Sequence, residues 1–142
     1  MEHIPFPFEM LIAQVPVSHQ SQTATSKTRW KETVRDHARS RIAELTDWSY
    51  VEDGALAATL YYFPPARMKG DVDNIVKLIV DGMVGVVYRD DQVIERIVVQ
   101  KFEPGTPWTF RNPTPTLSMA LDAVPPVLYI RIDDDLNWRD VQ

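Results

Sequence analysis

The sequence predicts an α+β fold in which a mixed β-sheet packs against two main helices within a single domain, residues 1–142. The chain has 142 residues, and either half alone would be too small to build its own core without disulfides or metals. Hydrophobic residues make up 44% and charged residues 25% of the chain, as is ordinary for a globular protein. Along the chain, the apolar patterns follow the order strand, helix, strand, helix, strand, strand, which indicates the mixed sheet.

The first predicted strand and helix lie in the N-terminal third of the chain. The strand covers Phe8–Gln14 and is ended by Pro16. After a polar loop, Ser26 is expected to cap a helix that runs from Lys27 to about Asp47. Apolar residues recur at helical spacing along this segment and are expected to face the core: Trp30, Val34, Ala38, Ile42 and Leu45.

The second predicted helix and the remaining strands follow. The run from Val72 to about Val86 is nearly all apolar and too long for a typical strand, so we predict a mostly buried helix. The segment 104–126 holds six of the eleven prolines and is predicted to be a long surface loop. Strands are expected at Ala55–Phe63, Val93–Phe102 and Val127–Asp133.

Composition excludes several classes of site. The chain has no cysteine, which rules out disulfides, thiolate zinc sites and cysteine nucleophiles and fits a cytoplasmic protein. No stretch approaches the roughly 20 apolar residues of a membrane span, so we expect no membrane anchor. The phosphate-loop and dinucleotide-binding motifs are also missing, and we expect no organic cofactor. A net charge of −5 argues against indiscriminate coating of nucleic acid.

Acidic residues instead form a pattern on the second predicted helix. Asp73, Lys77 and Asp81 fall on one polar stripe of an otherwise apolar element. Carboxylates are costly to desolvate, and Lys77 neutralises only one unit of charge, so this stripe favours a divalent cation. Mg²⁺ prefers hard oxygen ligands and usually takes one or two carboxylates together with water and phosphate. The structural alternative is that Asp71 caps the helix and that Asp90-Asp91 forms a turn before a strand.

Two further patterns have both a structural and a functional interpretation. Lys27, Lys31, Arg35 and Arg39 stand four residues apart and form a ridge on one helix, which is either a solvated face or a phosphate-contacting surface. The sequence from Gly82 to Gly85 matches the G-x-x-G pattern of some RNA-binding loops. Apolar residues surround it, so close helix packing or a helix end is the favoured interpretation.

The acidic segments together resemble a known family. The series D-V-D-N-I-V-K at 71–77, followed by R-D-D-Q-V-I at 89–94, is similar to the signature of the RusA-type Holliday junction resolvases. The close match covers roughly residues 61–101. The resemblance implies a RusA-like fold and a metal-dependent endonuclease that acts as a homodimer. The resemblance further implies that this enzyme resolves four-way DNA junctions by paired symmetric nicks in recombination and repair.

The resemblance also implies roles for individual residues. Asp71, Asp73 and Asp91 match the metal-binding carboxylates, Asp90 matches a further acidic position, and Lys77 matches the lysine needed for cleavage. The expected cofactor is Mg²⁺, with Mn²⁺ as an alternative. The residues expected to hold the DNA arms are basic: Lys27, Lys31, Arg35, Arg39, Arg67 and Lys69.

Two other functions remain open from the sequence. The first is a branched-DNA binding module whose catalytic activity has decayed, which would bind junctions without nicking them. The second is a metal-dependent phosphoesterase that acts on nucleotides or other small substrates, which would release phosphate and leave DNA intact.

Overall fold

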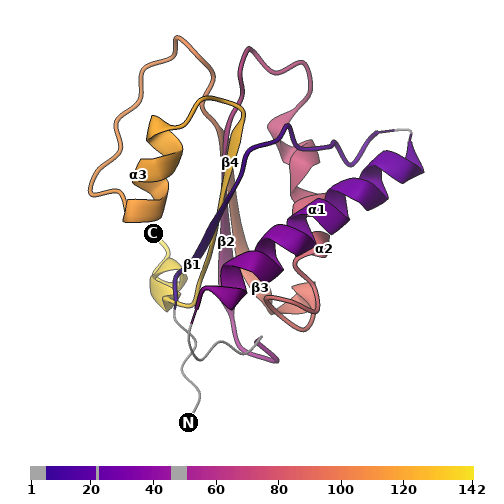
Figure 1. Ribbon diagram of the computed structural model, residues 1–142. Helices are drawn as coiled ribbons and strands as arrows, with labels where there is room; N and C mark the ends of the chain where they lie inside the picture. The colour runs from indigo at the N-terminus through magenta and orange to yellow at the C-terminus, as the bar shows by residue number, and fades with distance from the viewer. Residues whose placement is uncertain (1–5, 22, 46–50) are drawn as a thin grey trace.

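Figure 1 shows the computed structural model, which describes residues 6–21, 23–45 and 51–142. These residues form a four-stranded sheet, three helices and three short 3₁₀ turns. The strands are β1 (Phe8–Ile12), β2 (Leu56–Phe63), β3 (Ile94–Lys101) and β4 (Val127–Asp133). The helices are α1 (Ala24–Ala43), α2 (Val76–Gly82) and α3 (Pro115–Asp122), and the turns are η1 (Val72–Ile75), η2 (Asp91–Val93) and η3 (Leu136–Arg139).

The sheet is mixed, as predicted. Its strand order is β1-β4-β2-β3, with β2 and β3 parallel and the other two pairs antiparallel. The parallel pair requires a long crossover, which contains η1, α2 and η2. The predicted metal-binding and catalytic residues therefore all belong to the connection between two neighbouring strands.

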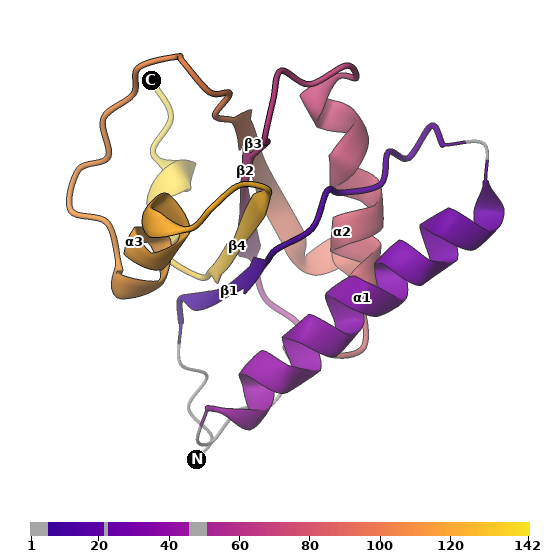
Figure 2. The same ribbon diagram turned by 45° about the horizontal axis from the view of Figure 1, so that its top comes forward.

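Helices cover the two faces of the sheet unequally. Helices α1 and α2 lie together on one face, and α3 lies on the other (Figures 1 and 2). The main core is between the sheet and the first pair, where Leu56, Leu60 and Tyr62 of β2 pack with residues of both helices. A smaller aromatic cluster on the opposite face contains Phe63, Phe102 and Tyr129. Successive side chains of a strand thus point alternately to the face covered by α1 and α2 and to the opposite face.

Helices α1 and α2 approach closely at Gly82. A Cβ atom at this position would lie 2.8 Å from Cβ of Val34 and 3.0 Å from the carbonyl oxygen of Lys31. Gly82 is also the last residue of α2. The structure therefore confirms that the G-x-x-G sequence marks close helix packing at a helix end.

The structure corrects the predicted ends of both helices. Helix α1 begins at Ala24 with Thr23 at its N-cap, so Ser26 lies inside the helix and does not cap it; the predicted end at Asp47 lies outside the described residues. The predicted helix at 72–86 is a 3₁₀ turn followed by a seven-residue helix. The apolar run is longer than the helix because residues beyond α2 are buried without being helical. Among them, Met83, Val87 and Tyr88 are fully buried.

The proline-rich segment contains a helix that the sequence interpretation missed. Pro115 lies at the start of α3, where its fixed φ angle suits a helix and its missing N–H needs no partner. The hydroxyl of Thr114 caps this helix by accepting a hydrogen bond from the Leu117 amide at 3.1 Å. The prediction of a continuous loop at 104–126 was therefore wrong for residues 115–122.

The C-terminal turn η3 is bound to the start of β3 through one carboxylate. Glu95 accepts hydrogen bonds from Nη2 and Nε of Arg139 at 2.8 and 2.9 Å and from the indole of Trp138. The Arg139 and Trp138 hydrogen bonds lower the pKa of Glu95 to about 2. This contact therefore joins the C-terminal turn η3 to the first residues of β3.

The contact predicts an unusual pH dependence. Because the pKa of Glu95 in the folded protein lies below its ordinary value of 4.5, its stabilisation is complete above pH 4.5 and is lost as the pH falls through about 2. The tryptophan fluorescence of the wild type, after subtraction of a Trp138→Phe variant, is expected to stay constant from pH 7 to pH 4. A transition centred near pH 4.5 would contradict the contact, and Glu95→Gln serves as the uncoupled reference.

Candidate metal and nuclease site

Lys77 lies between two carboxylates that come from different elements. Its Nζ is 3.2 Å from Oδ1 of Asp81, one turn further along α2, and 3.7 Å from Oδ2 of Asp91 in η2. The side chains of Lys77 and Asp91 are 54% and 43% exposed, so the cluster is open to solvent and to a ligand. The two halves of the acidic signature therefore meet at this lysine.

The electrostatics of the cluster keep Lys77 positively charged. The hydrogen bond to Asp81 and the charges of Asp81 and Asp91 raise the pKa of Lys77 above its usual value. Tyr88 lies beneath the same two acids and donates a hydrogen bond from its buried hydroxyl to the carbonyl of Val80 at 2.6 Å. Burial raises the pKa of Tyr88, and the charges of Asp91 and Asp81 raise it further. The phenol thus stays neutral and supports α2.

Asp90 and Asp91 have different surroundings although they are adjacent. The carboxylate of Asp90 accepts a hydrogen bond from the Gln92 amide at 2.9 Å and caps η2, and this bond lowers its pKa. Asp90 therefore has the structural role in a turn that was the alternative interpretation of Asp90-Asp91. The carboxylate of Asp91 faces Lys77 instead.

Asp71 and Asp73 are exposed on η1. Asp71 occupies the N-cap position, yet its carboxylate makes no capping hydrogen bond. The turn is held by its backbone instead, because the carbonyl of Asn74 accepts a hydrogen bond from the amide of His19 at 2.7 Å. The structural alternative, in which the Asp71 carboxylate caps the helix, is therefore not seen, and this side chain is exposed to solvent.

The structure does not join all the predicted ligands into one cluster. Across residues 6–21, 23–45 and 51–142, no three acidic side chains lie close enough together to form a metal-binding group. Asp91 and Asp81 each contact Lys77, while neither Asp71 nor Asp73 has an ion pair with this lysine. The donor chemistry nevertheless fits Mg²⁺, because the acids are exposed hard-oxygen donors and this ion commonly takes only one or two carboxylates. The structure adds Asp81 to the cluster around Lys77. From the sequence, Asp81 is predicted to lie on the polar stripe but not among the metal ligands.

The cationic ridge borders this cluster. Lys31, Arg35 and Asp81 line one hollow of about 340 Å³ between α1 and α2, and Nη2 of Arg35 is 3.5 Å from the carbonyl oxygen of Asp81. Lys27 precedes them by one turn, whereas Arg39 at the other end is exposed and lies 3.8 Å from Asp36. The central residues of the ridge are thus next to the acids, and Arg39 fits the solvated-face alternative.

Arg67 and Lys69 lie on the loop that leads to η1. The loop is held by the carboxylate of Glu103, which accepts a hydrogen bond from the Met68 amide at 2.7 Å. This bond is the main reason why the pKa of Glu103 is lowered. Both basic side chains are exposed, and they line an apolar hollow of about 290 Å³ that also contains Asp71. They are therefore placed to contact a ligand that reaches Asp71.

Comparison with known proteins identifies a family that the chain matches. The family model described as endodeoxyribonuclease RusA matches residues 13–110, which is more than half of the chain. The match contains every predicted catalytic, metal-binding and DNA-binding residue. A search of the curated proteins finds no match. Among the described residues, no helix is both long enough and apolar enough to cross a membrane.

Proposed function

This chain belongs to the endodeoxyribonuclease RusA family, and from that membership we propose that it is a Mg²⁺-dependent endonuclease that resolves four-way DNA junctions. It acts as a homodimer that makes paired symmetric nicks. The observation that carries the proposal is the contact of Lys77 with Asp91, because it links the two separate halves of the family signature. Asp71 and Asp73 supply further exposed carboxylates in η1, on the same connection between β2 and β3.

The chemistry of phosphodiester hydrolysis assigns a task to each group. The attacked phosphate gains negative charge in the transition state, and the attacking water must lose a proton. Asp71, Asp73 and Asp91 would hold the metal, and Asp90 lies next to Asp91 in the chain. When bound, Mg²⁺ neutralises phosphate charge and makes its bound water more acidic. Lys77, whose neighbours keep it protonated, would contact the nonbridging oxygens of the scissile phosphate.

Lys77 also has a task before DNA arrives. Its ammonium group holds the carboxylates of Asp81 and Asp91 near one another and offsets their mutual repulsion. A phosphate that enters the cluster competes with the two carboxylates for Lys77. A divalent cation that enters it competes with Lys77 for the carboxylates. Because Lys77 is more than half exposed, its side chain can turn toward the incoming phosphate without breaking buried contacts.

Cleavage assays with three DNA structures test the proposed function. A four-way junction, a splayed duplex and a linear duplex are compared at matched concentration, with Mg²⁺ and after chelation by EDTA. We expect Mg²⁺-dependent cutting of the junction at symmetric positions and no cutting after chelation. Junction binding without nicks at any Mg²⁺ or Mn²⁺ concentration would indicate the decayed module. Phosphate release from nucleotides without DNA cleavage would indicate the small-substrate phosphoesterase.

The cationic ridge predicts a specific salt dependence. Each lysine or arginine that neutralises a phosphate contributes about one unit to the slope of log K against log salt. Lys31→Ala and Arg35→Ala are each expected to weaken junction binding and to reduce this slope by about one unit. Arg39→Ala, in which the lost cation already faces Asp36, is the matched control. Slopes for Lys31→Ala and Arg35→Ala equal to that of the wild type would show that the ridge does not touch the phosphates.

A further inference from the structure

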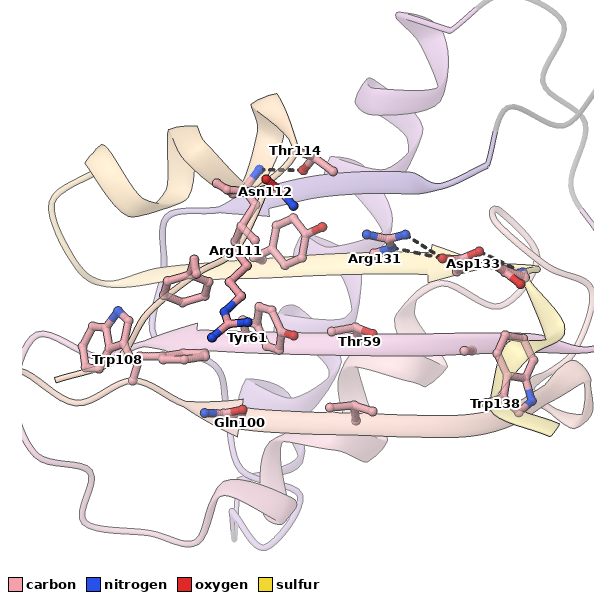
Figure 3. A pocket seen from close by; sticks show the side chains of 18 of the residues that line it. Thr59, Tyr61, Gln100, Trp108, Arg111, Asn112, Thr114, Arg131, Asp133 and Trp138 are labelled. Atoms are coloured by element: carbon pink, nitrogen blue, oxygen red, sulfur yellow. Dashed lines mark hydrogen bonds and ion pairs between the residues drawn. The ribbon is translucent and has the colours of Figure 1, made fainter. Parts of the chain in front are cut away.

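An open groove lies on the sheet face opposite α1 and α2 (Figure 3). Its volume is about 610 Å³, which is within the range of ligand-binding pockets. The floor is made by the side chains of β2, β3 and β4 that point away from the main core. The groove is therefore separated by the sheet from the cluster at Lys77, which lies on the side of α2.

Strand register explains why the floor is hollow. Three rows of side chains cross the sheet, since each β2 residue is paired with one residue of β3 and one of β4. The middle row and one outer row have small residues at their centres, Thr59 and Ala57. Neighbouring rows are separated by two residues, or about 7 Å, along each strand, so the three rows together span about 13 Å. The rows are Gln100–Tyr61–Tyr129, Val98–Thr59–Arg131 and Arg96–Ala57–Asp133.

Aromatic side chains border one end of the groove. Tyr61 stacks on Tyr129 at a ring separation of 5.7 Å and contacts Phe102 edge-on at 5.2 Å. Trp108 is held by an edge contact with Phe102 at 5.2 Å, yet 38% of it remains exposed. These packed rings have fixed positions, so a ligand ring can stack on them without first ordering a mobile side chain.

Arg111 brings a positive charge over the same end. It precedes Asn112, whose φ of 50° places the chain in the left-handed region that asparagine tolerates, just before the cap of α3. This turn directs Arg111 from the loop down toward Tyr61 (Figure 3). In the part of the chain that the structure describes, neither Arg111 nor Arg96 has an acidic side chain within ion-pair distance. Both guanidinium groups are therefore available to an anion.

The charge pattern distinguishes the two ends of the groove. Arg131 is already paired with Asp133, with Nη2 and Nε at 2.7 and 3.2 Å from the same carboxylate oxygen. Of the acidic lining residues, Asp133 lies toward Trp138 (Figure 3), and Asp135 is the N-cap of η3, the turn that contains Trp138. The end formed by Trp108, Tyr61 and Arg111 has no acidic lining residue. An anionic ligand with flat rings is therefore complementary to that end.

We propose that this groove binds an unpaired strand of DNA, with bases stacked on Trp108 and Tyr61 and phosphates held by Arg111 at the end that has no acidic lining residue. The choice of DNA rests on the proposed endonuclease function, whereas stacking and charge are properties of the groove itself. Stacking of successive bases on aromatic side chains beside a cationic groove is the general means of binding single strands. The floor accepts a short run of nucleotides, because its length exceeds that of one base.

Fluorescence anisotropy with a labelled oligo(dT) of about ten nucleotides, in EDTA to prevent cleavage, tests the proposal. The full chain is expected to bind the oligomer. Trp108→Ala and Arg111→Ala are each expected to weaken binding by about 5- to 100-fold. Trp108→Phe keeps a stacking ring and is expected to restore most of the affinity. Arg29→Ala removes an exposed arginine of α1 on the other side of the sheet and is the charge-matched control.

Two further arms separate stacking from other causes. An abasic oligomer of the same length and charge is expected to bind much more weakly than oligo(dT); equal binding would overturn base stacking. Light scattering of Trp108→Ala and Arg111→Ala is expected to show the same oligomeric state as the wild type. A change from dimer to monomer would overturn the proposal and assign the groove to the interface between two copies.

Cleavage of a fully paired four-way junction is measured in parallel to keep this proposal separate from the proposed function. Junction cleavage without any oligo(dT) binding by the wild type would overturn the groove proposal alone. Oligo(dT) binding that depends on Trp108 and Arg111, in a protein that cleaves no DNA, would support the groove proposal while refuting the nuclease.

Discussion

Asp91→Asn is expected to slow junction cleavage by about 10²- to 10³-fold while leaving junction binding close to that of the wild type. The substitution preserves the shape of the side chain and removes the negative charge that faces Lys77 at 3.7 Å. In the proposed mechanism, the substitution removes a metal ligand and an anchor for the lysine together. Binding is expected to be retained because the proposal assigns the arms of the junction to the basic residues of α1 and of the loop before η1.

The surroundings of Asp91 make this variant a clean test. Asp90, its neighbour, caps η2 through the Gln92 amide, so Asp91→Asn removes no capping hydrogen bond and is expected to fold normally. Asp122→Asn, at an exposed acid in α3 on the opposite face of the sheet, is the matched control. Cleavage by Asp91→Asn at the wild-type rate would refute the role assigned to this residue. A parallel loss in Asp73→Asn would extend the site to η1.

Gly82→Ala is expected to destabilise the protein by about 1–3 kcal/mol, because the new methyl group meets atoms that are already packed. Its Cβ would lie 2.8 and 2.9 Å from Cβ and Cγ1 of the fully buried Val34, and 3.0 Å from a backbone carbonyl of α1. Alanine favours helix over glycine by at most about 1 kcal/mol in a helix interior, and Gly82 is at the end of α2. The clash therefore outweighs the gain in helix propensity.

Thermal unfolding followed by circular dichroism measures this effect. For a chain of this size, 1 kcal/mol corresponds to a fall of about 3–5 °C in Tm. Gly70→Ala is the control, because a Cβ there has nothing within 4 Å and the backbone needs no left-handed conformation. A Tm for Gly82→Ala equal to that of Gly70→Ala would show that α1 and α2 separate easily. Reduced junction affinity in Gly82→Ala is also expected, since the hollow shared by Lys31 and Asp81 lies at this helix contact.

Local patterns were sufficient to predict the sheet. Alternating or continuous apolar runs bounded by prolines located all four strands to within about two residues. The apolar spacing of α1 was also sufficient, since Trp30, Val34 and Ala38 are its buried residues. These signals are local because a strand or an amphipathic helix is specified by which of its own positions face the core.

Helix ends and the third helix could not be predicted in the same way. The apolar run after Val72 continues past α2 because Met83, Val87 and Tyr88 are buried in turns, and burial without regular structure has no periodic signature. The prolines around α3 suggested a loop because their number was weighed without their positions. Pro115 is at the one end of a helix where proline is favoured, and Pro125 and Pro126 follow its other end.

The sequence by itself determined the family, the mixed sheet and the identity of the acidic residues, because these depend on short segments whose residue types and spacing are visible in the chain. The metal-binding role of Asp71, Asp73, Asp90 and Asp91 stays a prediction. Only the tertiary structure decided that Lys77 joins Asp81 to Asp91, and that Arg111 comes to lie over Tyr61. Both contacts depend on how segments distant in sequence pack on the two faces of one sheet, which no local pattern specifies.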